Sequence, residues 1–456
     1  MALKAIFNLF LMHKVSRMDG LNRLRVIYVW LCPLQIDKNN VKTLKAFRRP
    51  YMPFSLQVLF YKSLMLMTKC VMKFVPDAKP TVLSGEGASL KLAGTISQLG
   101  LKKILIVTDA MLVKLGVISP VEEALKAQGV DVIIYDGVEP DPSFTVVEAG
   151  LEMLKQHECD SVLAIGGGSS IDAAKVVALA ASNNKSPRQL EGRFVAKLPA
   201  LPLFAIPTTA GTGSEVTVAA VISDPQAGNK KLVLDPKLVP MAAALDPKIM
   251  VGLPPAITAA TGMDALTHAV EAYLSEFATK ETDAYALSAT KMILDNLEAA
   301  YNDGGNLAAR EAMVMASYYA GLAFTKAFVG YVHAIAHQFG AKYHTPHGFA
   351  NALVLPHILE FSKDRVSGRL ASLAVACGLG EASENEWALA QKFIDKVWAM
   401  NEAMGIPKTL DALQVHDIQA ISEAAMHEGN YTYPVPKYMR LEECQDILRK
   451  LLPVTD

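Results

Sequence analysis

The sequence has few cysteines and no two of them form a CxxC pair. Five are scattered through 456 residues, at Cys32, Cys70, Cys159, Cys377 and Cys444. An odd, dispersed set argues against the disulfide framework of a small secreted protein and against a thiolate zinc site. We therefore expect reduced thiols and a cytoplasmic protein.

An excess of one charge is also missing, because 44 Lys and Arg residues are matched by 45 Asp and Glu residues. A nucleic-acid-binding protein usually has a clear basic excess, so no nucleic-acid partner is expected.

Long uncharged runs are absent too. The most apolar candidate, residues 54–75, is interrupted by three lysines, so we expect no stable membrane span. With 51% apolar residues, the chain is not a disordered one.

The balanced total charge conceals a basic head. Residues 1–75 hold 13 Lys and Arg and 2 acidic residues, leaving 31 basic and 43 acidic residues in the remainder. A secretory signal is the weakest interpretation, because the apolar run at 6–12 is short and no small-residue cleavage site follows. A transit-like or membrane-surface segment fits the composition better. The simplest interpretation is an extension before a working start near Met52, with an amphipathic helix over 54–74, so residues 1–76 form the first predicted segment.

From residue 77 to about 250, short β-branched runs alternate with helix-patterned stretches. Strands are expected at 104–108, 130–135, 161–165, 203–206 and 216–222, and helices at 120–128, 144–156 and 171–181. Alternation at this spacing predicts βαβ units and a mostly parallel sheet buried on both faces. We therefore predict an α/β domain over 77–250, with its ligand at the carboxyl ends of the strands.

Three glycines, Gly166, Gly167 and Gly168, follow the expected strand at 161–165 and precede Ser169 and a helix. Such a loop brings backbone N–H groups and a helix N-terminus to one point, which suits a pyrophosphate. It is neither a Walker loop nor a GxGxxG motif. A plain glycine turn with a serine cap is the alternative interpretation.

Two further features follow strands of the same domain. Asp109 stands at the tip of the strand expected at 104–108, where an acid can accept both hydroxyls of an adenosine ribose and would repel a 2′-phosphate. An ordinary capping aspartate is the alternative. Asp109 precedes the glycines by 57 positions, the reverse of the usual order, which indicates a Rossmann-like fold of a different lineage. The segment 207–215, PTTAGTGSE, offers hydroxyls for phosphate or nicotinamide, unless it is only a solvated turn.

Beyond residue 250 the short β-branched runs end and the apolar residues recur with helical periodicity, so we predict an all-helical domain over 251–456. Helices are expected at 256–275, 284–301, 308–328, 332–342 and 387–404. Five of the ten histidines lie between 333 and 357.

The spacing of these groups predicts a metal site. Asp264 and His268 are four residues apart, as are His333 and His337, so each pair shares one helix face. His347 lies in a Thr-Pro-His-Gly loop ending that can bring it back toward the second pair. One carboxylate and three imidazoles suit Fe(II) or Zn(II). A histidine with a satisfied ring remains the alternative for any one of them.

These residues resemble the iron-containing (group III) alcohol dehydrogenase family from about residue 77 to the C-terminus. The motifs that carry the resemblance are GGGSSIDAAK, PTTAGTGSEVT, GMDALTHAVEAY and the block HAIAHQFG…TPHGFANALVLPH. The resemblance implies a dehydroquinate synthase-like architecture, in which a Rossmann-like NAD-binding α/β domain precedes an all-α metal-binding catalytic domain. It also implies a small alcohol or aldehyde as substrate, with NAD and Fe²⁺ as cofactors; Zn²⁺ suits the same ligands.

The resemblance assigns roles by position. The metal ligands would be Asp264, His268, His333 and His347, and the catalytic group near substrate and nicotinamide would be His337. The cofactor-binding residues would be Asp109, Gly166, Gly167, Gly168, Ser169, Asp172, Thr208, Thr209, Ser214 and a lysine before the Leu-Val-Leu-Asp-Pro run, where spacing favours Lys230 over Lys231. One departure is Lys326-Ala327, where many members have Asn-Ala. The first 50 residues have no counterpart in the family pattern.

Two other function classes compete with this one. A dehydroquinate synthase-like lyase would share NAD, metal and fold, but it needs a Lys and Arg cluster for a sugar phosphate, which is missing at 264–275 and 333–351. A non-catalytic metal- or nucleotide-binding protein is disfavoured by ligand sets on both domains. We therefore expect an iron-type, NAD-dependent alcohol dehydrogenase. The sequence names neither its alcohol nor its oligomeric state, and a homodimer stays open.

Overall fold

The computed structural model describes residues 53–224 and 229–453, so the interpretations of residues 1–52 lie outside the described residues. The chain divides into two compact units at Pro76 and Asp77. In the first unit the helix α4 spans Phe54–Met72, as expected. It is not amphipathic, however, because Leu59 and Leu66 are more than 60% exposed while Met65 is buried. Apolar residues on all sides of the helix explain this difference from the prediction.

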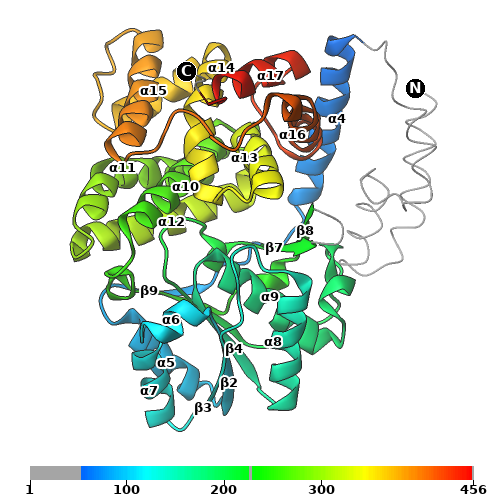
Figure 1. Cartoon of the computed structure of the whole chain (residues 1–456), viewed down its shortest axis with the longest axis vertical. Coiled ribbons are helices and arrows are strands. Elements are labelled where there is room, and N and C mark those ends of the chain that lie inside the picture. The colour runs from blue at the N-terminus through cyan, green and yellow to red at the C-terminus, as the bar shows by residue number, and fades with distance from the viewer. Residues whose placement is uncertain (1–52, 225–228, 454–456) are drawn as a thin grey trace, which may run out of the picture. The chain divides into compact units, whose positions relative to one another are not determined.

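The second unit begins with a six-stranded parallel sheet in the order β1-β9-β6-β4-β2-β3 (Figure 1). Its strands are β1 (Thr81–Ser84), β2 (Lys103–Val107), β3 (Asp131–Tyr135), β4 (Ser161–Gly166), β6 (Leu203–Pro207) and β9 (Ala242–Leu245). Four of the six were predicted. The sequence analysis missed β1 and β9; β9 contains three alanines, which have low strand propensity.

Helices cover both faces of this sheet. On β2, Ile104 and Ile106 pack into one core, and Leu105 and Val107 pack into the other. The first core is closed by α5 (Ala88–Gln98) and α7 (Ser119–Ala127), and the second by α8 (Phe144–Gln156) and α9 (Gly168–Asn183). The short helix α6 (Ala110–Lys114) follows β2. Alternate burial on two faces confirms the doubly covered sheet that the apolar runs predicted.

A second, smaller sheet contains β5 (Gly192–Arg193), β8 (Asn229–Leu234) and β7 (Ala219–Asp224), and β7 and β8 are antiparallel. The strand expected at 216–222 therefore begins later and belongs to this sheet, which corrects the prediction. Its residues alternate between buried and more exposed, as in a strand with one covered face. Residues 214–216 form a 3₁₀ turn, η3.

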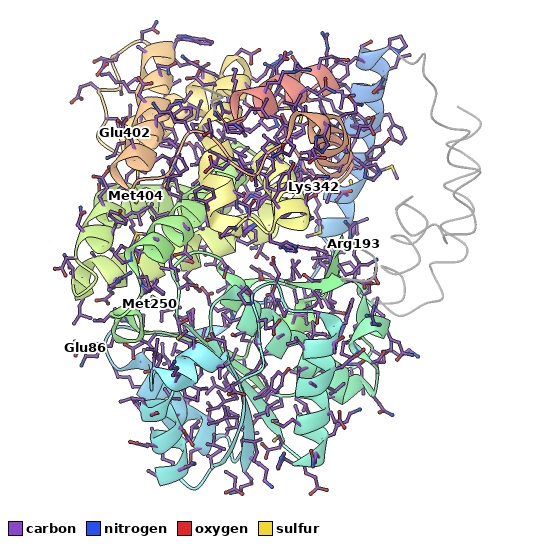
Figure 2. All side chains as sticks on the ribbon, in the orientation of Figure 1. Glu86, Arg193, Met250, Lys342, Glu402 and Met404 are labelled. Atoms are coloured by element: carbon purple, nitrogen blue, oxygen red, sulfur yellow. The ribbon has the colours of Figure 1, made fainter. Side chains whose placement is uncertain are left out.

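The remainder of the unit is helical, as predicted. It comprises α10 (Pro255–Leu274), α11 (Lys280–Asn302), α12 (Leu307–Ala327), α13 (Tyr331–Tyr343), α14 (His347–Ala376), α15 (Glu386–Ala403), α16 (Ile418–Thr432) and α17 (Leu441–Lys450). Met250, at the end of the sheet-bearing half, is buried where the two halves of the unit meet (Figure 2). In the part of the chain that the structure describes, no single helix is long and apolar enough to cross a membrane, although the bent pair α12 and α13 passes that test by length and composition alone.

The helix α14 corrects one prediction about the site. His347 was placed in a loop ending, but it is the first residue of α14. Pro346 directly precedes it, and a proline is compatible with a helix start because it lacks only an N–H that the first turn does not use. His347 is therefore held by regular backbone.

Candidate active site

Four predicted site residues lie together in the helical half. One ligand atom from each of Asp264, His268, His333 and His347 lies within 4.8 Å of the other three. The helix α10 supplies the first two, α13 the third and α14 the fourth. The first three are buried, whereas His347 is half-buried. The structure thus assembles the predicted ligand set.

The spacing of these atoms is close to that of the ligands around a four-coordinate transition metal, although one of the two distances below is slightly wider. Asp264 Oδ1 lies 3.9 Å from His333 Nε2 and 3.5 Å from His347 Nε2. Bonds of about 2.0–2.2 Å in tetrahedral geometry place ligand atoms roughly 3.3–3.6 Å apart. Burial lowers the pKa of His333 well below its usual value and that of His347 to about 4. Both rings are therefore neutral and have the lone pair that a metal requires.

The amide of Asn351, which the sequence analysis did not single out, marks the centre of the site. This fully buried residue places its Nδ2 atom 2.7 Å from Asp264 Oδ1 and 3.2 Å from Nε2 of both His333 and His347. One point within reach of a carboxylate oxygen and two imidazole nitrogens is a point where a cation would be well coordinated. Asn351 lies four residues after His347 on the same helix, and this spacing could have indicated from the sequence that it faces the metal site.

Glu271 is a second residue that the sequence analysis missed. Its Oε2 lies 2.6 Å from His333 Nδ1, and its Oε1 accepts a 2.7 Å hydrogen bond from the Val332 N–H. A carboxylate behind a ligating imidazole fixes the orientation of the ring and increases its basicity. Glu271 follows Asp264 by seven residues, so both lie on one face of α10. That spacing within GMDALTHAVEAY could have revealed it.

The sheet-bearing half approaches this centre through the segment 207–215. His268 Nδ1 lies 3.3 Å from the Gly211 carbonyl oxygen. A Cβ on Gly211 would lie 2.7 Å from the Thr261 carbonyl oxygen on α10, so only glycine permits this approach. The segment therefore links the carboxyl edge of the sheet directly to a metal ligand.

The glycine loop and the segment 207–215 form one cradle at that edge. Gly166 ends β4, which pairs with β6, and its carbonyl accepts a 3.0 Å hydrogen bond from the Thr208 N–H. A Cβ on Gly168 would lie 2.8 Å from Thr212 Cγ2, and one on Gly167 would lie 3.4 Å from Thr209 Oγ1. The helix α9 begins at Gly168, so its free N–H groups open into the cradle, where a pyrophosphate fits.

Asp172 and Ser214, two of the predicted cofactor-binding residues, form hydrogen bonds with other protein groups. Asp172 Oδ1 accepts a 2.5 Å hydrogen bond from Ser214 Oγ, and Oδ2 accepts one of 2.8 Å from the Val221 N–H. Ser214 Oγ also accepts a bond from Lys175 Nζ at 3.1 Å. These bonds lock α9 to the segment 207–215. The contacts of Asp172 and Ser214 show that they support the cradle. That either residue also contacts the dinucleotide directly stays a prediction.

Lys175, the last residue of the GGGSSIDAAK motif, is fully buried at the centre of this network, a role that the sequence did not predict. Its Nζ also donates to Thr217 Oγ1 at 2.8 Å and to the Ala219 carbonyl at 2.8 Å, and Asp172 is its nearest anion at 4.0 Å. Burial lowers the pKa of Lys175 to about 8. The buried cation is stabilised only by this full set of partners.

We expect Lys175→Met to lower the free energy of unfolding by about 3–5 kcal/mol, because it leaves the Asp172 carboxylate and the carbonyls of Thr217 and Ala219, which both accept from Lys175 Nζ, without their cation. NADH affinity should fall with it, since the cradle loses its support. Denaturant unfolding and NADH fluorescence titration measure the two effects. Exposed Lys91 on α5 provides the matched control Lys91→Met. A variant as stable as that control would show that the network is dispensable.

Asp109, Lys230 and Ser169 surround the same edge. Asp109 caps α6, since its Oδ1 accepts a 3.0 Å bond from the Leu112 N–H. Lys230 Nζ pairs with Asp141 Oδ1 at 2.6 Å, and the Asp141 N–H donates to Ser169 Oγ at 3.3 Å. Lys230 also reaches α13, within 3.7 Å of a Cβ built on Gly340. Lys231 instead pairs with Glu191, so Lys230 is the lysine that faces the helical half.

Cofactor preference tests the role of Asp109. The variant Asp109→Asn retains a capping oxygen for α6 but removes the negative charge that would repel a 2′-phosphate. We expect the preference of kcat/KM for NAD over NADP to narrow by roughly tenfold, which corresponds to about 1.4 kcal/mol. Asp131→Asn, at an exposed position at the start of β3, should leave the preference unchanged. Equal use of both cofactors by the wild-type protein would contradict the assignment.

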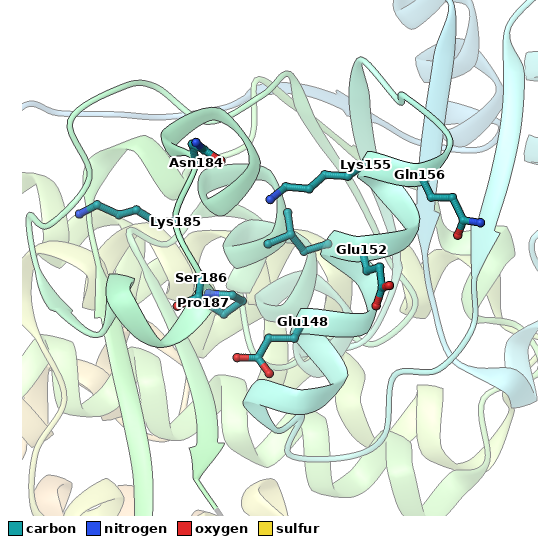
Figure 3. Close-up of a pocket in the computed structure, with 9 residues that line it drawn as sticks. Glu148, Glu152, Lys155, Gln156, Asn184, Lys185, Ser186 and Pro187 are labelled. Atoms are coloured by element: carbon teal, nitrogen blue, oxygen red, sulfur yellow. The ribbon is translucent and has the colours of Figure 1, made fainter.

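The hollow in Figure 3 lies elsewhere on the sheet-bearing half. It has a volume of about 730 Å³, and its lining includes Glu148 and Lys155 of α8 and Asn184 and Lys185 just after α9. The glycine loop adjoins the opposite end of α9, and a helix of 16 residues is about 24 Å long. This hollow is therefore remote from the cradle, and we assign it no part in the active site.

Lys326, which stands where many members of the family have Asn, forms ion pairs at the protein surface. Lys326 Nζ lies 2.9 Å from Asp77 Oδ2 and 2.8 Å from Glu281 Oε2, and Lys79 pairs with the same Glu281. The lysine thus joins α12 to α11 and to the segment before β1.

His337 lies beside the ligand set but outside it. Its ring centroid is 5.3 Å from that of His347, with the two rings nearly parallel, and 5.8 Å from that of His333. Its Nδ1 lies 2.6 Å from Glu428 Oε1 on α16. The side chain keeps 28% of its surface exposed. The structure therefore places His337 where the sequence predicted it, next to the metal centre and paired with a carboxylate that the sequence did not indicate.

Comparison with known proteins gives a consistent result. A family model described as iron-containing alcohol dehydrogenase matches residues 79–247, and one described as the C-terminal part of the Fe-containing alcohol dehydrogenase family matches residues 258–452. Alcohol dehydrogenase 4 of Saccharomyces cerevisiae is 42% identical over 78% of this chain and 93% of its own length. NAD-dependent methanol dehydrogenase of Bacillus methanolicus is 38% identical over 83% and 99%. The crystal structure of a 1,3-propanediol oxidoreductase is 37% identical, covers 83% of this chain and 99% of that one, and has a TM-score of 0.80.

Proposed function

Because the chain belongs to the iron-containing alcohol dehydrogenase family, we propose that it catalyses reversible hydride transfer between a small alcohol or aldehyde and NAD. One observation carries the proposal: the Gly211 carbonyl, part of the nucleotide cradle, lies 3.3 Å from Nδ1 of the metal-site residue His268. This contact supports a dinucleotide site and a metal site that adjoin each other. The named relatives are dehydrogenases, which favours this activity over the dehydroquinate synthase-like lyase.

Different residues of the chain would bind the metal, orient the dinucleotide and exchange a proton with the substrate. Asp264, His268, His333 and His347 would hold Fe²⁺, and Zn²⁺ suits the same ligands. The bound ion supplies Lewis-acid polarisation of the substrate oxygen. The cradle at Gly166–Gly168 and Thr208–Thr209 orients the dinucleotide, and Lys230 offers it a positive charge. His337, whose Nδ1 is bonded to Glu428, is left with Nε2 as the ring atom that can exchange a proton with substrate.

The direct test is an alcohol panel. Purified protein is loaded anaerobically with Fe²⁺, its metal content is measured, and NADH formation is followed with 1-alkanols, diols and propanediol-like substrates. We expect turnover with at least one primary alcohol, and NADH oxidation with the corresponding aldehyde. Protein that holds one metal per chain and binds NADH, yet turns over no alcohol or aldehyde, would contradict the proposed function.

The location and assembly of the protein are separate proposals. A cytoplasmic location is supported by the free thiols of Cys70, Cys159, Cys377 and Cys444, the cysteines within the described residues. Cell fractionation of the full chain tests it. A homodimer stays a prediction, which light scattering of the purified protein would check.

A further inference from the structure

We propose that Glu428 is a positioning residue for His337: it holds the imidazole in the tautomer and orientation in which Nε2 accepts the proton of the substrate. The inference rests on the proposed function and adds a residue to it. Glu428 lies on α16, 91 residues beyond His337. It belongs to none of the motifs that identified the site.

The contacts of Glu428 fix both of its oxygens. Oε1 lies 2.6 Å from His337 Nδ1 and accepts a 2.6 Å hydrogen bond from the Tyr433 hydroxyl. Oε2 accepts a 3.0 Å bond from Gln338 Nε2. Adjacent residues of α13 thus bind the two oxygens of one carboxylate, while Tyr433 braces it from the end of α16. The carboxylate cannot rotate without breaking a bond, so the ring that it binds is also held.

The neighbouring histidine on α13 is built in the same way. His333 Nδ1 bonds to Glu271, and its Nε2 faces the ligand set. His337 lies one helical turn later and bonds through Nδ1 to Glu428, but it is not part of the four-residue ligand set. Two carboxylate–imidazole pairs therefore stand side by side on one helix. The Glu271–His333 pair positions a metal ligand. The Glu428–His337 pair has the same geometry but lies outside the ligand set, so we infer that it positions a proton acceptor.

The proton transfer that this arrangement supports is balanced. In alcohol oxidation the proton of the substrate hydroxyl moves to Nε2 of His337, and the ring becomes an imidazolium. The Nδ1 proton stays in its hydrogen bond to Glu428, whose negative charge stabilises the cation. In aldehyde reduction the Nε2 proton returns to the substrate oxygen. A carboxylate behind a catalytic imidazole has the same two effects, orientation and charge stabilisation, in the serine-protease triad.

The variant Glu428→Gln tests the inference, because it retains the size and an acceptor oxygen but removes the charge. We expect kcat to fall roughly 10- to 100-fold, part of the 10²–10⁴-fold that general acid–base catalysis supplies. Metal content, NADH affinity and the KM for alcohol should stay within about threefold of wild type. Glu428→Asp should recover part of kcat. The control is Glu423→Gln on the same helix, whose carboxylate bonds only to surface Gln419 among the described residues.

A spectroscopic measurement separates this inference from the activity. In metal-free protein labelled with ¹⁵N-histidine, the short Nδ1–H bond of His337 should give a strongly deshielded proton, absent from both Glu428→Ala and His337→Ala. Its absence from the wild-type protein, or a wild-type kcat in Glu428→Gln, would overturn the inference. So would a loss of kcat that merely follows lost metal or lost NADH binding. An inactive wild-type protein that shows the signal would instead refute the proposed function and leave the His337–Glu428 pair established.

Discussion

Replacing His333 or His268 by alanine is expected to abolish bound metal and alcohol-dependent NADH formation, while NADH binding remains. Loss of an outer partner such as a ligand-orienting carboxylate typically costs 10- to 100-fold in metal affinity or activity, and loss of one of four direct ligands should cost more. The dinucleotide cradle lies on other elements and is bonded to His268 through the Gly211 carbonyl, so NADH affinity should change little in His333→Ala and at most modestly in His268→Ala. Elemental analysis after anaerobic loading and NADH fluorescence titration measure the two properties.

His416→Ala is the matched control for these variants, because its side chain is 80% exposed on the helical half. It should retain full metal and activity. If His333→Ala or His268→Ala kept stoichiometric metal, the ligand assignment would be wrong for that residue.

The variant His337→Ala should keep its metal but lose about 10²–10⁴-fold in kcat, because a positioned proton acceptor is gone. Its pH profile should change as well. Burial alone lowers the pKa of His337, but the charge and hydrogen bond of Glu428 more than offset this, so the pKa is raised above its usual value. Alcohol oxidation needs the neutral ring, so the wild-type rate should fall as pH drops through that raised pKa. The variant should lack this acidic limb.

Two outcomes would contradict this assignment. Loss of metal from His337→Ala would make His337 a ligand and reopen the assignment of His347 or His268. A fall in kcat with an unchanged pH profile would instead show that the ring only packs against the cofactor.

The sequence predicted those parts of the site that local patterns encode. The pairs Asp264–His268 and His333–His337 could be recognised because a helix places residues four apart on one face. The glycine loop was recognisable because it follows a buried strand and starts a helix, and the ends of parallel strands meet at one edge. The predicted doubly covered sheet and helical half follow from the same periodicities.

The remaining parts depend on tertiary contacts. Glu428 reaches His337 from another helix, and neither its neighbours nor its spacing distinguishes it from Glu423, the other acidic residue of α16. Lys175 has a role only because Thr217 and Ala219 fold over it. The separate sheet of β7 and β8 was missed because a short apolar run does not specify its partner strand. Glu271 and Asn351 differ from these, since their helical spacing to known ligands was visible in the sequence.

The strand order also has a consequence for synthesis on the ribosome. In the six-stranded sheet, β1 pairs with β9, the last strand to be made, and β9 ends at Leu245. No strand of this sheet comes from the helical half. Every hydrogen bond between its strands is therefore made among residues 81–245, in keeping with the N-terminal-first folding of nascent chains. The sheet that supports the nucleotide cradle can thus form before the helices that carry the metal ligands have packed together.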